Sequence, residues 1–89
     1  MSFETVENIE LRDRPGSPVE ERVLGTPETE AEAIDLGRAA RQTFLESGRH
    51  DYAWWIVREP GMTLARWIAD STSSKEFALD LTSGVLVEY

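Results

Sequence analysis

The sequence has no cysteine, and only one histidine and one lysine occur among its 89 residues. Without cysteine, the chain forms no disulfide bond and no thiolate metal site. The longest uninterrupted apolar run, residues 53–57, is far too short to cross a bilayer. The acidic N-terminus also lacks the apolar segment of a secretory signal. We therefore expect a cytoplasmic protein that does not bind membranes.

Sequence motifs for catalysis or cofactor binding are also missing. His50 has no recognisable nucleophile spacing around it, which favours a solvated loop histidine over a catalytic one. Residues 70–74 resemble the Asp-x-Ser-x-Ser cation motif of integrin-like adhesion domains, with Thr72 in place of the first serine. The parallel strand and further ligands of that motif have no counterpart here, so a polar turn is favoured. Glycine-rich phosphate loops and calcium-loop spacings do not occur. We therefore expect no enzymatic activity, no metal and no cofactor.

The formal net charge of −8 is spread unevenly along the chain. Residues 1–35 hold ten acidic and three basic residues, whereas residues 36–89 hold seven and six. Because an acidic surface repels phosphate, direct binding to nucleic acid is disfavoured and a basic partner is favoured. Two further interpretations of the acidic residues stay open. They keep a small protein soluble, or they imitate a phosphate backbone in an inhibitor of phage or mobile-element origin. Eight of the nine basic residues are arginine, a bias typical of a GC-rich genome such as an actinobacterial one.

Residues 1–25 form either an ordered hairpin or a mobile arm. Residues 3–13 resemble a weak strand, in which Thr5, Glu7, Ile9 and Leu11 share one face. Two prolines and a glycine in residues 14–18 predict a turn, and residues 19–24 are a candidate return strand. Because the segment is acidic and poor in apolar residues, both alternatives stay open. Residues 26–89 complete what we expect to be a single domain.

A helix is predicted after Gly25. Thr26 suits the N-cap, Pro27 suits the first helical position, and acidic residues follow in the first turns. Gly48 is a natural stop. One apolar stripe is formed by Ala33, Leu36, Gly37, Ala40 and Phe44. Its small residues indicate that the helix lies close against a sheet that carries large side chains.

Four strands are predicted after the helix, over residues 51–59, 63–70, 76–81 and 85–89. The sequence thus predicts an α+β fold of β-β-α-β-β-β-β order. In it, one helix packs on a four-stranded antiparallel meander, and an N-terminal hairpin is added if it is ordered. This element order resembles the β-grasp arrangement, and no function follows from that likeness.

The most distinctive segment is a tryptophan-rich hairpin from about residue 52 to residue 68. If the turn consists of two residues, Pro60 and Gly61, the facing pairs are Val57 with Leu64, Trp55 with Arg66, Trp54 with Trp67 and Ala53 with Ile68. A longer loop would change this register, because an L-Pro-Gly turn matches the twist of a hairpin poorly.

Both faces of this hairpin are apolar, which is unusual for an antiparallel pair. We expect Trp54 and Trp67 to face the helix, and Trp55 to stack with Arg66 on the outer face. One helix covers one face, so the other is covered by the N-terminal hairpin, by a second copy or by a partner, or it is exposed. The alternative is that all three tryptophans belong to the core.

The sequence therefore predicts a non-enzymatic protein-interaction or regulatory module that uses this outer face, as a single chain or as a homodimer. The alternative is the acidic inhibitor described above. No small-molecule ligand is expected. The predicted contact residues are Trp55, Arg66, Val57, Leu64 and Ile68.

Overall fold

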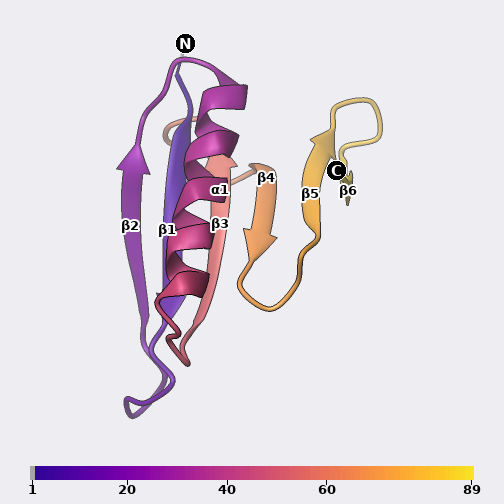
Figure 1. The fold of residues 1–89 in the computed structure, drawn as a ribbon. Helices are drawn as coiled ribbons and strands as arrows, with labels where there is room; N and C mark the ends of the chain where they lie inside the picture. Colours follow the sequence, from indigo (N-terminus) through magenta and orange to yellow (C-terminus); the bar gives the residue numbers. More distant parts are fainter. Residues whose placement is uncertain (1) are drawn as a thin grey trace.

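A computed structural model describes residues 2–89, and its strands form one six-stranded sheet with a single helix (Figure 1). The elements are β1 (Glu4–Glu10), β2 (Val19–Gly25), α1 (Glu30–Glu46), β3 (Tyr52–Arg58), β4 (Ala65–Asp70), β5 (Glu76–Asp80) and β6 (Val85–Glu88). The strand order is β2-β1-β3-β4-β5-β6, and every neighbouring pair is antiparallel. The predicted α+β class and element order are confirmed.

Strand β1 lies inside the sheet. It pairs with β2 on one side and with β3 on the other, from Glu4↔Arg58 to Glu10↔Tyr52. The N-terminal segment is therefore an ordered hairpin that adds two strands to the meander of β3 to β6. Because this hairpin extends the sheet in its own plane, it covers neither face of β3 and β4. The N-terminal hairpin therefore does not cover the second face. A second copy, a partner or exposure to solvent remains.

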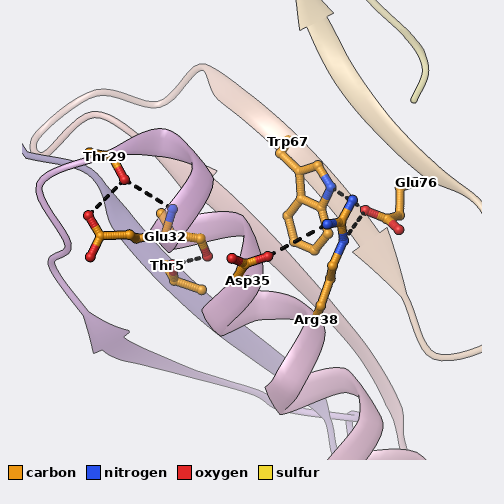
Figure 2. Close-up of polar contacts among 8 residues, drawn as sticks. Thr5, Thr29, Glu32, Asp35, Arg38, Trp67 and Glu76 are labelled. Carbon is orange, nitrogen blue, oxygen red and sulfur yellow. Dashed lines mark hydrogen bonds and ion pairs between the residues drawn. The ribbon is translucent and has the colours of Figure 1, made fainter.

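Helix α1 begins later than predicted, with Thr29 as its N-cap. The backbone N–H of Glu32 donates to the Thr29 hydroxyl at 3.1 Å, and this hydroxyl donates to the Glu32 carboxylate at 2.8 Å (Figure 2). The Thr-x-x-Glu spacing of a capping box therefore sets the start. Pro27 stays outside the helix, and its carbonyl accepts the Phe3 N–H at 2.8 Å. The prediction of Thr26 as the N-cap is wrong because this bond ties the preceding segment to β1.

The helix packs on β1, β3 and β4 and touches β2 (Figure 1). Gly37 permits the close approach that the small residues predict, since a Cβ there would lie 2.6 Å from Cζ3 of Trp67. The Thr5 hydroxyl also donates to the Ala33 carbonyl at 2.7 Å. The core cluster between the helix and the sheet consists of Ala33, Ile34, Phe44, Ala53, Trp55, Val57, Trp67 and Ala69.

The register of the tryptophan hairpin differs from the prediction. The observed pairs are Trp54↔Asp70, Trp55↔Ala69, Ile56↔Ile68 and Val57↔Trp67. Pro60 and Gly61 do form a turn, closed by the Met62 N–H donating to the Glu59 carbonyl at 3.0 Å. The chain then stays unpaired through Leu64, so the partner of each β3 residue lies three positions farther along than predicted.

An odd shift in register exchanges the faces of one strand relative to the other. Trp55 and Trp67 therefore share the helix side, and both have 0% exposure. Trp54 lies on the opposite face, called the outer face below, and is partly exposed. The predictions that Trp54 faces the helix and that Trp55 lies on the outer face are wrong, because both depended on a two-residue loop.

The C-terminal hairpin of β5 and β6 extends beyond the helix (Figure 1). All four residues of β6 are exposed, including Val85, Leu86 and Val87. A helix about 10 Å wide covers only two or three strands spaced by about 4.8 Å, and α1 is centred on β1 and β3. The far end of the sheet is therefore a single layer.

Candidate interaction face

The outer face carries a row of apolar side chains that runs across five strands. Backbone pairing places these residues side by side, because directly opposed residues of an antiparallel pair point to the same face. The row, called the apolar row below, consists of Val23, Val6, Ile56, Ile68 and Phe77 on β2, β1, β3, β4 and β5. Within residues 2–89 the only helix lies on the other face, so no second layer covers this row.

Exposure varies along the apolar row, and Val6 on β1 is its least exposed member. Val6 is fully buried among its neighbours, whereas Val23 is 46% exposed. Ile56, Ile68 and Phe77 are partly exposed. The row is thus ordered by the sheet and still accessible to another molecule along most of its length.

A hollow of about 430 Å³ lies beside the apolar row. The rings of Tyr52 and Trp54 stand 5.6 Å apart along one wall. Ile68 and Phe77 of the apolar row also line it, with Glu10 at its rim. An aromatic hollow next to an apolar row is a shape that receives a protruding side chain of a partner.

The polar margin of the outer face carries charges of both signs, which pair within the chain. Arg58 lies 3.2 Å from Glu4 and 3.5 Å from Glu21. Arg12 lies 3.6 Å from Glu10, and its guanidinium stands 5.2 Å from the centre of the Tyr52 ring. Each of these three acids is thus paired with an arginine of the same chain, and Lys75 also lines the hollow.

Asp70 closes the polar loop between β4 and β5. Its Oδ1 accepts the N–H groups of Thr72 and Ser73 at 3.0 Å and 2.9 Å, and its Oδ2 accepts the Tyr52 hydroxyl at 3.1 Å. Burial disfavours the Asp70 charge, but these bonds outweigh it and hold the pKa of Asp70 below its ordinary value. The pKa of Tyr52 is raised by burial and by its bond to Asp70. Arg41 of α1 clamps the loop by donating to the Asp70 carbonyl at 2.8 Å. Residues 70–74 are thus the polar turn that the sequence favours.

Two charged groups on the helix side fix the buried tryptophans. The Glu7 carboxylate, 7% exposed, accepts the Trp55 Nε1–H at 2.9 Å and pairs with Arg22 at 2.9 Å. The Glu76 carboxylate accepts the Trp67 Nε1–H at 2.8 Å and pairs with Arg38, as Figure 2 shows. Both indole N–H groups therefore have a carboxylate acceptor inside the fold. Trp55 and Trp67 are core residues that stabilise the structure.

The predicted contact residues do not lie together in the structure. Trp55 and Val57 have 0% exposure beneath the helix, whereas Leu64 is 56% exposed in the loop before β4. Arg66 is the extra residue of a β-bulge opposite Arg58, and it turns to the helix side. Ile68 alone belongs to the apolar row.

Arg66 does not stack on Trp55 as predicted. It lies 3.4 Å from Glu30 at the start of α1 and 3.5 Å from Glu59, and it stands 5.8 Å from the Phe3 ring. The predicted Trp55–Arg66 pair is wrong because the residue opposite Trp55 is Ala69. Whether Arg66 or Leu64 contacts a partner stays a prediction.

The residues that the sequence reasoning missed are Trp54, Ile56 and Phe77. Alternation along β3 already groups Trp54 with Ile56, and alternation along β5 singles out Phe77. Only the register between β3, β4 and β5 places Ile56 and Phe77 in one row, next to Trp54. The sequence pattern therefore indicated which residues of one strand share a face. It did not show which residues of different strands lie side by side.

The candidates for a catalytic or metal site in the described part of the chain are His50 and groups of metal-ligating side chains. His50 is exposed in the loop after α1. Among residues 2–89, no group of three His, Cys, Asp or Glu side chains is placed to hold a metal ion. In the same residues, no helix is long and apolar enough to span a bilayer.

The scan against protein-family models, the search of curated proteins and the search of solved structures each found no match to this chain. A functional inference for this chain therefore depends on the geometry of the outer face.

Proposed function

We propose that this protein is a non-enzymatic protein-interaction module that binds its partner through the outer face of the sheet. The single observation that supports the proposal is the apolar row, whose accessible part runs over β3, β4 and β5 through Ile56, Ile68 and Phe77, with no second layer over it among residues 2–89. Contiguous exposed apolar surface of this kind marks interaction sites in soluble proteins. Its contact residues are Trp54, Ile56, Ile68 and Phe77, with Val23 at one end.

The chemistry of the outer face also describes the partner. Apolar side chains fill the centre and charged groups of both signs stand at the margin, which is the usual arrangement of an interface core and its rim. The partner therefore presents apolar residues at the centre of its contact surface and polar groups around them. The apolar contact supplies affinity, and the rim charges supply orientation and association rate.

The alternative, an acidic inhibitor that imitates nucleic acid, depends on unpaired negative charge in the front half of the chain. Glu4, Glu7, Glu10 and Glu21 of that half each lie within 3.6 Å of an arginine. These pairs reduce the density of free charge. The two proposals differ in salt dependence, because a charge-driven contact weakens steeply as salt rises.

The test is capture of a partner from a cell lysate of the source organism at two salt concentrations. The baits are the unaltered chain, Ile68→Lys and Met62→Lys. Met62 is the matched control, because it is 53% exposed in the β3–β4 loop, outside the apolar row. Circular dichroism and thermal unfolding first establish that all three baits are folded.

We expect one protein to be retained by the unaltered chain and by Met62→Lys, to be lost with Ile68→Lys, and to resist high salt. A partner that all three baits retain would overturn the outer face as the docking surface. A partner that elutes at high salt from every bait would favour the acidic inhibitor instead.

A further inference from the structure

Strand β6 presents a backbone edge with no neighbouring strand among the described residues. The Tyr89 N–H donates to the Glu76 carbonyl at 2.7 Å, so Tyr89 directs its backbone groups toward β5. Backbone direction alternates along an antiparallel strand. Val85 and Val87 therefore also bond toward β5, and the N–H and C=O groups of Leu86 and Glu88 point to the open side.

The two edges of the sheet differ in how they are protected. Edge strand β2 carries Glu20, Glu21 and Arg22 along its middle, and charged residues discourage edge-to-edge pairing. Edge strand β6 has the sequence Val-Leu-Val-Glu, with no proline and a single charge at its end. Its residues Val85, Leu86 and Val87 are 55%, 43% and 45% exposed. Only the β6 edge is suited to adding another strand.

We infer that β6 pairs with β6 of a second copy of this chain, antiparallel and about a two-fold axis perpendicular to the sheet. In this register Val87 faces Val87 of the second copy, and Leu86 faces Glu88 of the second copy. The outward N–H and C=O groups of Leu86 and Glu88 then form four backbone hydrogen bonds, and none of these groups is left unpaired.

The side chains agree with a second copy as the occupant. Glu88 meets an apolar residue of the other chain rather than its own counterpart, so like charges are not opposed. On the helix side, Val85 of one chain faces Tyr89 of the other, and the two Val87 side chains meet at the axis. A strand that is self-complementary in this way satisfies the requirement of an isologous two-fold interface.

This dimer goes beyond the proposed function and does not depend on it. An axis perpendicular to the sheet keeps both outer faces on the same side of a twelve-stranded sheet. The two apolar rows then lie end to end across the combined sheet, separated by the two β6 strands, so a partner with two binding segments gains avidity.

Sedimentation equilibrium of the full chain over a concentration series tests the inference. We expect a concentration-dependent rise toward twice the chain mass of 10.1 kDa. Because each chain carries a net charge of −8 and the β6 contact is mostly apolar, added salt should strengthen the dimer. A chain that remains monomeric up to about 1 mM at high salt would overturn the inference.

Variants at one position separate backbone pairing from hydrophobic association. Leu86→Pro removes an outward N–H that β5 does not use, and should weaken the dimer at least about tenfold while the β5–β6 pairing stays intact. Leu86→Val keeps that N–H and should still dimerise. Ile68→Lys alters the outer face and should leave the dimer unchanged. A dimer that survives Leu86→Pro, or that Ile68→Lys abolishes, would contradict pairing through β6.

A charge exchange tests the register. Leu86→Glu places a carboxylate opposite Glu88 of the second copy, at two symmetric positions, and should weaken the dimer about tenfold. Adding Glu88→Lys should restore it, since each new pair then has opposite charges. Failure of this rescue, with both variants folded, would overturn the pairing of Leu86 with Glu88.

Discussion

Two parts of the sheet differ in how their strands are covered. Strands β1, β3 and β4 form two layers with α1, which also touches the exposed edge strand β2, and every buried apolar side chain of the described residues lies between Val6 and Ala69. Strands β5 and β6 form one layer, with all residues of β6 exposed. One helix thus stabilises one part of the sheet and leaves the other as surface. We call these parts the two-layer body and the C-terminal hairpin.

The largest expected effect is the loss of a tryptophan from the two-layer body. Trp67→Ala removes a side chain with 0% exposure from the contact with Gly37, and should cost about 3–5 kcal/mol of unfolding free energy. Leu86→Ala in the C-terminal hairpin should change it by less than about 0.5 kcal/mol. Urea unfolding at low protein concentration measures both. Equal losses would show that the hairpin belongs to the same core.

A second prediction concerns the buried Glu7 carboxylate. Glu7→Ala leaves the Trp55 Nε1–H buried without an acceptor, and should cost about 1–3 kcal/mol. Glu7→Gln keeps an acceptor oxygen and should cost less. Urea unfolding of both variants makes the comparison. If both cost the same, the bond to Trp55 is not the cause.

A third prediction compares two nearby helix positions, of which only Gly37 reverses the usual preference for alanine over glycine. Alanine is favoured over glycine in a helix by about 1 kcal/mol, so Ala39→Gly on the exposed side should destabilise by about that amount. Gly37→Ala should destabilise too, by about 1 kcal/mol net, because its Cβ would overlap the Trp67 ring. Thermal unfolding of the two variants checks the signs. A more stable Gly37→Ala variant would refute the close contact.

The smallest predicted effect lies at Asp70, in the loop that joins the two-layer body to the C-terminal hairpin. The pKa of Asp70 is lowered in the folded chain, so its bonds stabilise the fold above about pH 4, the ordinary aspartate pKa. This contribution is lost as the pH falls through the lowered pKa. Asp70→Asn should therefore reduce stability at neutral pH and flatten its decline in acid. Unfolding curves measured between neutral and acidic pH test this, and an unchanged acid profile would contradict it.

The sequence predicts the local elements well because their signals are local. Alternation defines β5, Gly48 marks the helix end with a φ of +68°, and the stripe around Gly37 indicates close packing. The pairing of β1 with β3 joins segments on either side of the helix, and no local pattern specifies it.

The interaction face depends on two details that the sequence leaves open. The length of the loop after Pro60 decides the register, and the bulge at Arg66 turns that side chain toward Glu30. An error of three residues in the loop was enough to exchange Trp54 and Trp55 between the outer face and the core. The grouping of the β3 residues into two faces was correct. The assignment of these faces to the helix side and the outer side was wrong.

The most direct test of the outer face as the docking surface is acrylamide quenching of tryptophan fluorescence. Trp54 is the one partly exposed tryptophan, since Trp55 and Trp67 have 0% exposure. We predict one quenchable component, which is lost in Trp54→Phe, kept in Trp55→Phe, and shielded when the captured partner is bound. A quenchable component that belongs to Trp55, or one that stays open to acrylamide in the complex, would contradict this account.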